Sequence, residues 1–162
     1  MHQVDDTIVA VASALGGAVR GIVRVSGPDT LTVVSKRFKS RSEVEWRCLS
    51  ASQRIKGRFL IGEALGEVPC SAYIWPDERS YTRQPTVELH TIGSPPVLEA
   101  IVQSLCKDGA RLAQPGEFTM RAFLAGRLDL TQAEAVLGVI DATSQHDLDV
   151  ALSQLAGGLA AP

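Results

Sequence analysis

Two runs of apolar and β-branched residues predict two strands near the N-terminus. Residues 7–12 (TIVAVA) and 21–26 (GIVRVS) are rich in the β-branched side chains that strands favour. Gly16-Gly17 lies between them and indicates a turn, and Gly27-Pro28-Asp29 ends the second run. We therefore expect two early strands joined by a turn.

The middle of the chain also has a strand pattern. Short β-like runs alternate with glycines between residues 49 and 75, which favours a meander or hairpins. Residues 86–90 (TVELH) predict a cleaner strand. A period of two places its apolar residues on one face and Thr86, Glu88 and His90 on the other.

Two segments show helical spacing instead. Leu31, Val34 and Phe38 predict a first helix, and residues 94–109 predict a second, with Ser94-Pro95 as its start and a glycine as its stop. Basic residues lie where the first helix is expected to end, and cations suit that end of the helix dipole. A nucleic-acid-binding patch is the alternative interpretation. These basic residues are Lys36, Arg37, Lys39 and Arg41.

Residues 115–135 (PGEFTMRAFLAGRLDLTQAEA) predict a short helix, a polar hinge and a second helix. Thr131 and Glu134 fit a capping box, and apolar residues continue beyond them to Gly157-Gly158. This helix has more apolar surface than the preceding elements can cover. We therefore expect the chain to stop inside a helical domain, as its abrupt LAGGLAAP ending also suggests, or to pack on a second copy.

Composition narrows the class of protein. A chain of 162 residues with 45% hydrophobic content suits one buried domain, or one domain and part of another. A formal charge of -2 provides no general attraction to nucleic acid or to an anionic membrane. The three cysteines form no disulfide or zinc pattern. Because no signal peptide or membrane span is evident either, we expect a cytoplasmic protein with no membrane partner.

Familiar catalytic motifs are absent from the sequence. It contains no phosphate-binding P-loop, strand-bound dinucleotide fingerprint, serine-hydrolase elbow or zinc-protease motif. His2, His90 and His146 are not at metal-ligand spacing, so no metal site is expected.

Charged residues in apolar surroundings remain as binding candidates. Arg24 alternates away from two valines, so it lies either on a solvated sheet face or in a cleft as a guanidinium fork for a carboxylate or heterocycle. Glu88 is either solvated or able to bind the amidine edge of a pterin-like ring through two parallel hydrogen bonds. Arg127 and Asp129 fit a turn between helices, with Asp129 near the positive end of the second helix.

Segments in order along nearly the whole chain resemble the N-terminal part of the tRNA modification GTPase family called MnmE or TrmE. They are DTIVAVAS (6–13), GIVRVSGPD (21–29), SYT (80–82) with VELH (87–90), GARLAQPGEFTMRAFLAGRLDLTQAEAV (109–136) and IDATS (140–144). The resemblance implies an α+β domain over residues 1–118, with a mixed sheet and flanking helices like the folate-binding domain of aminomethyltransferases. Residues 119–162 would then begin an all-helical domain, into which a GTPase domain absent from this chain is inserted.

The resemblance also implies ligands and partners. Arg24, Glu88 and Arg127, the last where relatives commonly have Lys, would contact a tetrahydrofolate derivative, either 5-formyl- or 5,10-methylene-tetrahydrofolate, that supplies a one-carbon unit. The domain would form a homodimer and act with an FAD-dependent partner of the GidA or MnmG family on the wobble uridine of tRNA. GTP, magnesium and potassium would bind only in the missing GTPase domain, so this chain alone is not expected to be catalytic.

Three loops depart from the family pattern. Residues 80–85 are SYTRQP where the family has SYTGED, residues 90–95 are HTIGSP where it has HGGP, and SALGG (13–17) replaces a Pro-Pro-Gly-rich loop. Loss of glycine restricts the backbone. Two alternatives to a folate-binding module therefore stay open: a dimerisation module with a degenerate folate site, and a free-standing one-carbon transferase.

Overall fold

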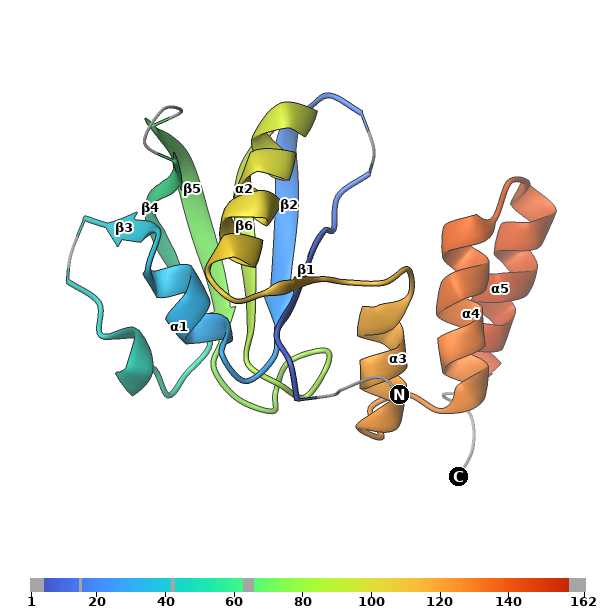
Figure 1. Ribbon diagram of the computed structural model, residues 1–162. Helices are drawn as coiled ribbons and strands as arrows, with labels where there is room; N and C mark the ends of the chain where they lie inside the picture. The colour runs from blue at the N-terminus through green and yellow to red at the C-terminus, as the bar shows by residue number, and fades with distance from the viewer. Residues whose placement is uncertain (1–4, 15, 42, 63–65, 158–162) are drawn as a thin grey trace. The chain divides into compact units, whose positions relative to one another are not determined.

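The computed structural model describes residues 5–14, 16–41, 43–62 and 66–157, drawn as the coloured ribbon in Figure 1. The chain divides into two compact units, residues 1–113 and 114–162. The family resemblance implied a boundary after Phe118. His2, Leu15 and residues 158–162, on which some of the predictions depend, lie outside the described residues.

The first unit is built on a seven-stranded sheet with the strand order β3-β4-β5-β6-β2-β1-β7. Neighbouring strands are antiparallel, except that β1 and β7 are parallel, so the predicted α+β class with a mixed sheet is confirmed. The strands are β1 (Ile8–Val11), β2 (Ala18–Ser26), β3 (Phe38–Ser40), β4 (Gln53–Gly62), β5 (Gly66–Trp75), β6 (Thr86–Gly93) and β7 (Arg111–Leu112).

Helices α1 (Thr30–Ser35) and α2 (Pro95–Lys107) lie on the same face of this sheet (Figure 1). Leu89 of β6 and Ile101 of α2 are both fully buried in the core between the two layers. Ser94 is the N-cap of α2, and Gly109 follows its end with φ 119°, as predicted. Within the described part of the first unit, no helix covers the opposite face of the sheet, which we call the open face.

The prediction for the first helix was wrong at its C-terminal end. Helix α1 stops at Ser35, no basic residue lies in its last turn, and Phe38 begins β3 instead. Phe38 is buried opposite Phe59 in the register of β4 and contacts the ring of Trp46, in the short 3-10 helix η1 (Trp46–Cys48), edge to face. Tertiary packing of this aromatic residue therefore outweighs its helical spacing.

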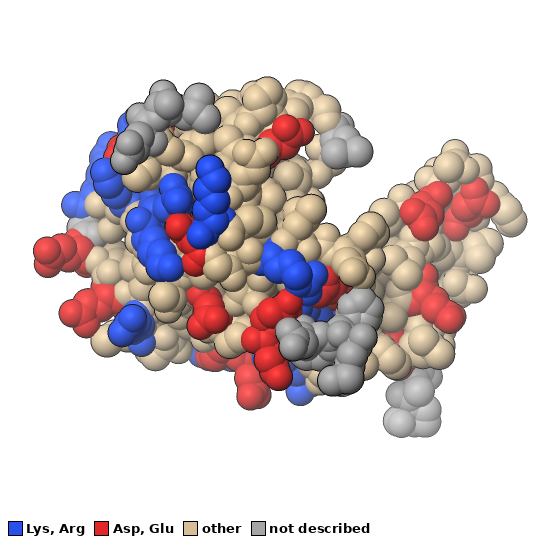
Figure 2. Space-filling model, in the orientation of Figure 1, with Lys and Arg blue, Asp and Glu red and all other residues tan. Residues whose placement is uncertain are grey.

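Two of the four basic residues after α1 pair with carboxylates, and Lys36 donates to the Asp108 carbonyl at the end of α2. Arg37 pairs with Asp108, and Lys39 and Arg58 both pair with Glu67. Figure 2, seen from the side that the helices cover, shows basic side chains gathered in this region with acidic ones among them. Carboxylates therefore compensate part of this positive charge, which weakens the argument for a nucleic-acid patch.

The second unit consists of three helices, α3 (Glu117–Leu124), α4 (Leu130–Asp141) and α5 (Gln145–Gly157). The predicted short helix and hinge are confirmed, but the capping box is formed by Asp129 and Gln132, not by Thr131 and Glu134. Asp129 accepts the Gln132 N–H at 2.7 Å, and the Gln132 amide oxygen accepts the Asp129 N–H at 3.0 Å.

The prediction of one long helix from residue 131 to 157 was also wrong. The chain leaves the helical conformation at Ala142, and Ser144 starts α5 by accepting the Asp147 N–H through its hydroxyl oxygen. Helices α4 and α5 pack against each other, and the buried Ala151 of α5 lies close to Gly138 of α4. Much of the apolar surface of this hairpin is nevertheless exposed, as the sequence suggested, at Leu130, Leu137, Ile140, Val150 and Leu152.

Helix α3 contains a buried ion pair that the sequence pattern did not reveal. The Arg121 Nη2 donates to Glu117 Oε1 at 2.9 Å, and each side chain is only 1% exposed. The other carboxylate oxygen of Glu117 accepts the backbone N–H of Gln114 at 2.8 Å. Glu117 thus accepts hydrogen bonds from the backbone before α3 and from the Arg121 guanidinium. A buried charge is stable only when it is paired and hydrogen-bonded in this way.

Candidate ligand-binding face

Arg24 and Glu88 lie directly opposite each other on neighbouring strands of the open face. They are a registered pair of β2 and β6, which places both side chains on the same side of the sheet. The Arg24 Nε and Nη2 donate to Glu88 Oε1 at 2.9 and 2.8 Å. The structure therefore joins two of the three residues that the sequence singled out.

This ion pair is accessible from solvent. The Arg24 side chain is 31% exposed and that of Glu88 18% exposed. A partly exposed pair of this kind contributes about 1 kcal/mol or less to stability, because water competes with both partners. A ligand that offers better hydrogen-bond geometry can therefore separate Arg24 from Glu88 at small cost.

The second carboxylate oxygen of Glu88 faces a histidine. His90 Nε2 lies 3.1 Å from Glu88 Oε2, so the carboxylate contacts a guanidinium on one side and an imidazole on the other. The His90 ring in turn lies against Tyr73 of β5, with 4.3 Å between ring centroids. Glu88 thus lies between a cation and an aromatic surface, which suits a flat ligand with N–H donors along one edge.

Tyr73 and the basic residues beyond it were missed by sequence reasoning. The guanidinium of Arg54 on β4 lies over the Tyr73 ring, 5.6 Å from its centroid. Alternation along β4 and β5 would have placed these residues on one face of each strand. Their proximity to Glu88 depends on β5 pairing with both β4 and β6, which no local pattern encodes.

A buried group of hydroxyls holds the loop that precedes β6. The Ser26 Oγ lies 2.6 Å from Thr82 Oγ1 and 3.0 Å from Thr86 Oγ1. Ser80 donates through its hydroxyl to the Gln84 carbonyl at 2.6 Å. These bonds tie residues 80–86 to the end of β2, two positions from Arg24.

Arg83 in this loop has a left-handed backbone, with φ 55°. It stands where the family pattern SYTGED has glycine, the residue that adopts this conformation most readily. The backbone at this position therefore keeps the left-handed conformation that glycine favours, although the residue is arginine.

Arg127, the third predicted residue, belongs to the second unit. It is exposed in the turn between α3 and α4, where its N–H donates to the Ala122 carbonyl at 2.9 Å. Gly126 precedes it with φ 69°, which allows the chain to leave α3. Asp129, two residues on, lies at the start of α4 as predicted, where it is the N-cap residue.

Among the described residues, no group of three His, Cys, Asp or Glu side chains is arranged to hold a metal ion. None of the helices in the described ranges is both long enough and apolar enough to cross a membrane.

An α+β domain with an accessible Arg–Glu pair on the open face of its sheet is a candidate small-molecule-binding domain. The sequence profile of the family described as GTP-binding protein TrmE N-terminus matches residues 7–127, so the chain belongs to this family.

Similar proteins carry a consistent name. The chain is 50% identical over 161 residues to a Rhodopirellula baltica protein named tRNA modification GTPase MnmE, covering 99% of this chain and 34% of that protein. Proteins of the same name from Streptococcus thermophilus and Streptococcus pyogenes are 40% and 42% identical, over 156 and 158 residues. Each of these matches covers 95% of this chain and 33% of the relative. The chain therefore spans about a third of the length of these relatives.

Proposed function

We propose that this chain is the tetrahydrofolate-binding and homodimerisation module of a tRNA modification GTPase that acts on the wobble uridine. The observation that carries the proposal is the accessible Arg24–Glu88 pair on the open face. The family and the name shared by the relatives support the tRNA-modifying context.

The chemistry of the pair suits a reduced pterin. The amino-pyrimidine edge of tetrahydrofolate presents parallel N–H donors. Glu88 would accept them in place of the Arg24 guanidinium at Oε1 and the His90 ring at Oε2. Arg24, once released, would bind a polar or carboxylate group of the ligand, and Arg127 would add a further cation. The bound 5-formyl- or 5,10-methylene-tetrahydrofolate would supply the one-carbon unit, while these residues bind and orient it.

The remaining parts of the reaction would lie outside this chain. GTP hydrolysis with magnesium and potassium would require the GTPase domain of a longer protein, because relatives are about three times as long. The exposed apolar surface of α4 and α5 would be covered by the rest of an all-helical domain. The dimer would then act in the cytoplasm on tRNA together with an FAD-dependent GidA or MnmG-type protein.

The experiment is a calorimetric titration with 5-formyltetrahydrofolate. The parent is expected to bind with a micromolar or lower Kd, about -8 kcal/mol or better. The Glu88→Gln protein loses the charge at constant shape, so its Kd should rise about 30-fold or more, since hydrogen bonds to charged groups contribute about 1.5–3 kcal/mol each. Arg79→Ala, which removes an exposed arginine paired with Asp77, is the matched control and should bind as the parent does.

Light scattering on the same samples measures the oligomeric state. A folded parent that stays monomeric would contradict the dimerisation part of the proposal. A folded parent that releases no heat with the folate would contradict the binding part and favour the degenerate-site alternative. Turnover of the folate by this chain alone would favour the free-standing transferase.

A further inference from the structure

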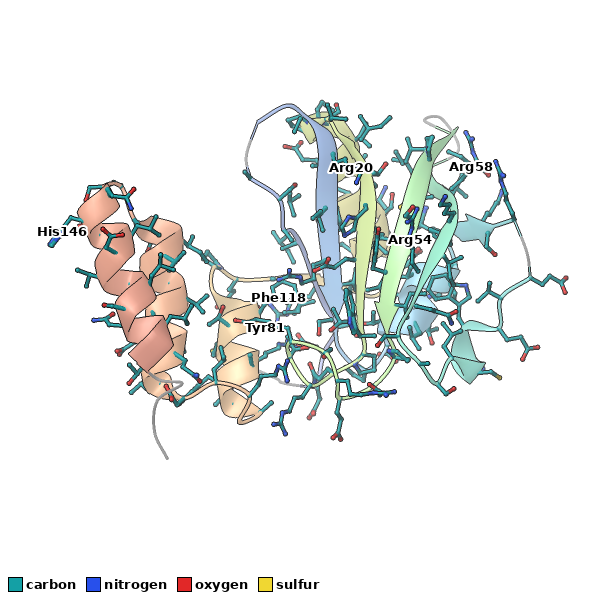
Figure 3. The ribbon with its side chains drawn as sticks, turned by 180° about the vertical axis from the view of Figure 1, so that it is seen from behind. Arg20, Arg54, Arg58, Tyr81, Phe118 and His146 are labelled. Carbon is teal, nitrogen blue, oxygen red and sulfur yellow. The ribbon has the colours of Figure 1, made fainter. Side chains whose placement is uncertain are left out.

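A cationic cavity lies on the open face, beside the Arg24–Glu88 pair. It has a volume of about 410 Å³ and is lined by residues from β2, β4, β5 and β6. Its lining contains the side chains Arg20, Arg54 and Lys56 and, among the described residues, no carboxylate. Figure 3, which views the molecule from behind, labels Arg20 beside β2 and Arg54 beside β4 and β5. The chain as a whole has a formal charge of -2, so this concentration of positive charge is local.

These three cations differ from the other basic residues of the sheet. Arg58, the next residue along the same face of β4, pairs with Glu67, and Arg37 pairs with Asp108. In the described part of the chain, Arg20, Arg54 and Lys56 form no ion pair with a carboxylate of the protein. They are therefore available to an anionic ligand, and guanidinium groups suit carboxylates well.

The cavity lies next to a row of residues that crosses the sheet and includes the proposed pterin site. Arg24, Glu88, Tyr73 and Arg54 are successive registered partners across β2, β6, β5 and β4. Since neighbouring strands lie about 4.8 Å apart, this row spans roughly 14 Å. His90, Ser71 and Lys56 form the adjacent row on the same face, and all three line the cavity.

The order of chemical groups along this row matches an elongated ligand. A carboxylate at Glu88 is followed by the Tyr73 and His90 rings, 4.3 Å apart, and then by Arg54 and Lys56 on β4. Arg20 lines the same cavity from β2. A folate has the corresponding order: a pterin with N–H donors, an aromatic benzoyl group and a glutamate with free carboxylates. Additional glutamates joined to the first would extend the anionic end of the ligand.

We propose that the cavity formed by Arg20, Arg54 and Lys56 binds the glutamyl tail of the folate and makes this chain selective for polyglutamylated forms. This inference rests on the proposed folate-binding function and adds the ligand form that the site prefers.

The test compares 5-formyltetrahydrofolate carrying one glutamate with the same compound carrying three. Calorimetric titration of the parent should give a Kd about tenfold lower for the triglutamate. In the double variant Arg54→Ala/Lys56→Ala this preference should disappear. Arg58→Ala removes a positive charge from the same face of β4 without altering the cavity lining, so it should keep the preference.

The other outcomes overturn the proposal in distinguishable ways. Equal affinity of the parent for both ligands, or a preference that survives in the double variant, would contradict the tail site while leaving the pterin site intact. If neither ligand binds to the folded parent, the proposed function fails as well. If the double variant lost affinity for tRNA and glutamate number had no effect, the cavity would belong to RNA phosphates instead.

Discussion

The two faces of the seven-stranded sheet are built from the same strands but have opposite characters. On β6, Val87 and Leu89 are fully buried beneath the helices, whereas the alternate residues Glu88 and His90 remain partly exposed on the open face. One face therefore stabilises the fold, and the other presents the groups that can bind a ligand. Substitutions on the two faces should consequently separate stability from binding.

The largest expected difference is in reactivity, between the buried thiol of Cys70 and the exposed thiol of Cys48. Cys70 of β5 faces the core, and its burial raises the pKa of its thiol from 9.0 to about 12, so its thiolate is about a thousandfold less populated at pH 8. Cys48 is exposed. Iodoacetamide at pH 8 should therefore modify Cys48 at least 100-fold faster than Cys70, as followed by peptide mass spectrometry.

The same shift predicts a pH dependence of stability. The pKa of Cys70 is higher in the folded protein than in the unfolded chain. The contribution of its protonated thiol to the free energy of unfolding is therefore complete below about pH 9 and is lost as pH rises toward 12. Equal labelling rates for the two thiols in the native protein would contradict the burial of Cys70 on the covered face.

Adjacent substitutions on β6 provide the next test. Leu89→Ala should lower the free energy of unfolding by about 3 kcal/mol, because it leaves a cavity in the core. Glu88→Gln should lower it by about 1 kcal/mol or less, since it removes only a partly exposed ion pair. Urea unfolding of both variants measures the difference. A larger loss for Glu88→Gln than for Leu89→Ala would reverse the roles assigned to the two faces.

A loop substitution should have the smallest effect and the opposite sign. Arg83→Gly relieves a left-handed backbone that costs a residue with a side chain about 1–2 kcal/mol, while glycine adds some entropy to the unfolded chain. The net result should be a gain of up to about 1 kcal/mol, seen as a higher midpoint of urea unfolding. Clear destabilisation would indicate that the Arg83 side chain holds the loop.

The sequence predicted features that depend on local chemistry. The strand at residues 86–90 and the start and stop of α2 follow from alternation, Ser94-Pro95 and Gly109, and the structure confirms them. The prediction of the capping box at the start of α4 failed because two pairs of residues fit the same motif. Asp129 with Gln132 satisfies a capping box as well as Thr131 with Glu134 does, and the choice depends on where the hinge ends.

The candidate site was predictable only in part for a related reason. Arg24 and Glu88 were identified individually, but their ion pair requires the β2–β6 register. The contact of His90 with Tyr73 requires β5 beside β6, and that of Arg54 with Tyr73 requires β4 beside β5. Sequence alternation shows on which face of a strand a residue lies, whereas strand order decides which residues meet across the sheet. Phe38 was misassigned for the same reason, because its burial opposite Phe59 is a tertiary contact.

A titration followed by two-dimensional amide NMR shows directly whether the folate binds to the open face. With 5-formyltetrahydrofolate we expect the largest shifts at Arg24, Glu88 and His90. Shifts should be smaller at Tyr73 and Arg54, and α1 and α2 should change little. Shifts concentrated in those two helices, or an unchanged spectrum of the folded protein at millimolar ligand, would contradict binding at the open face.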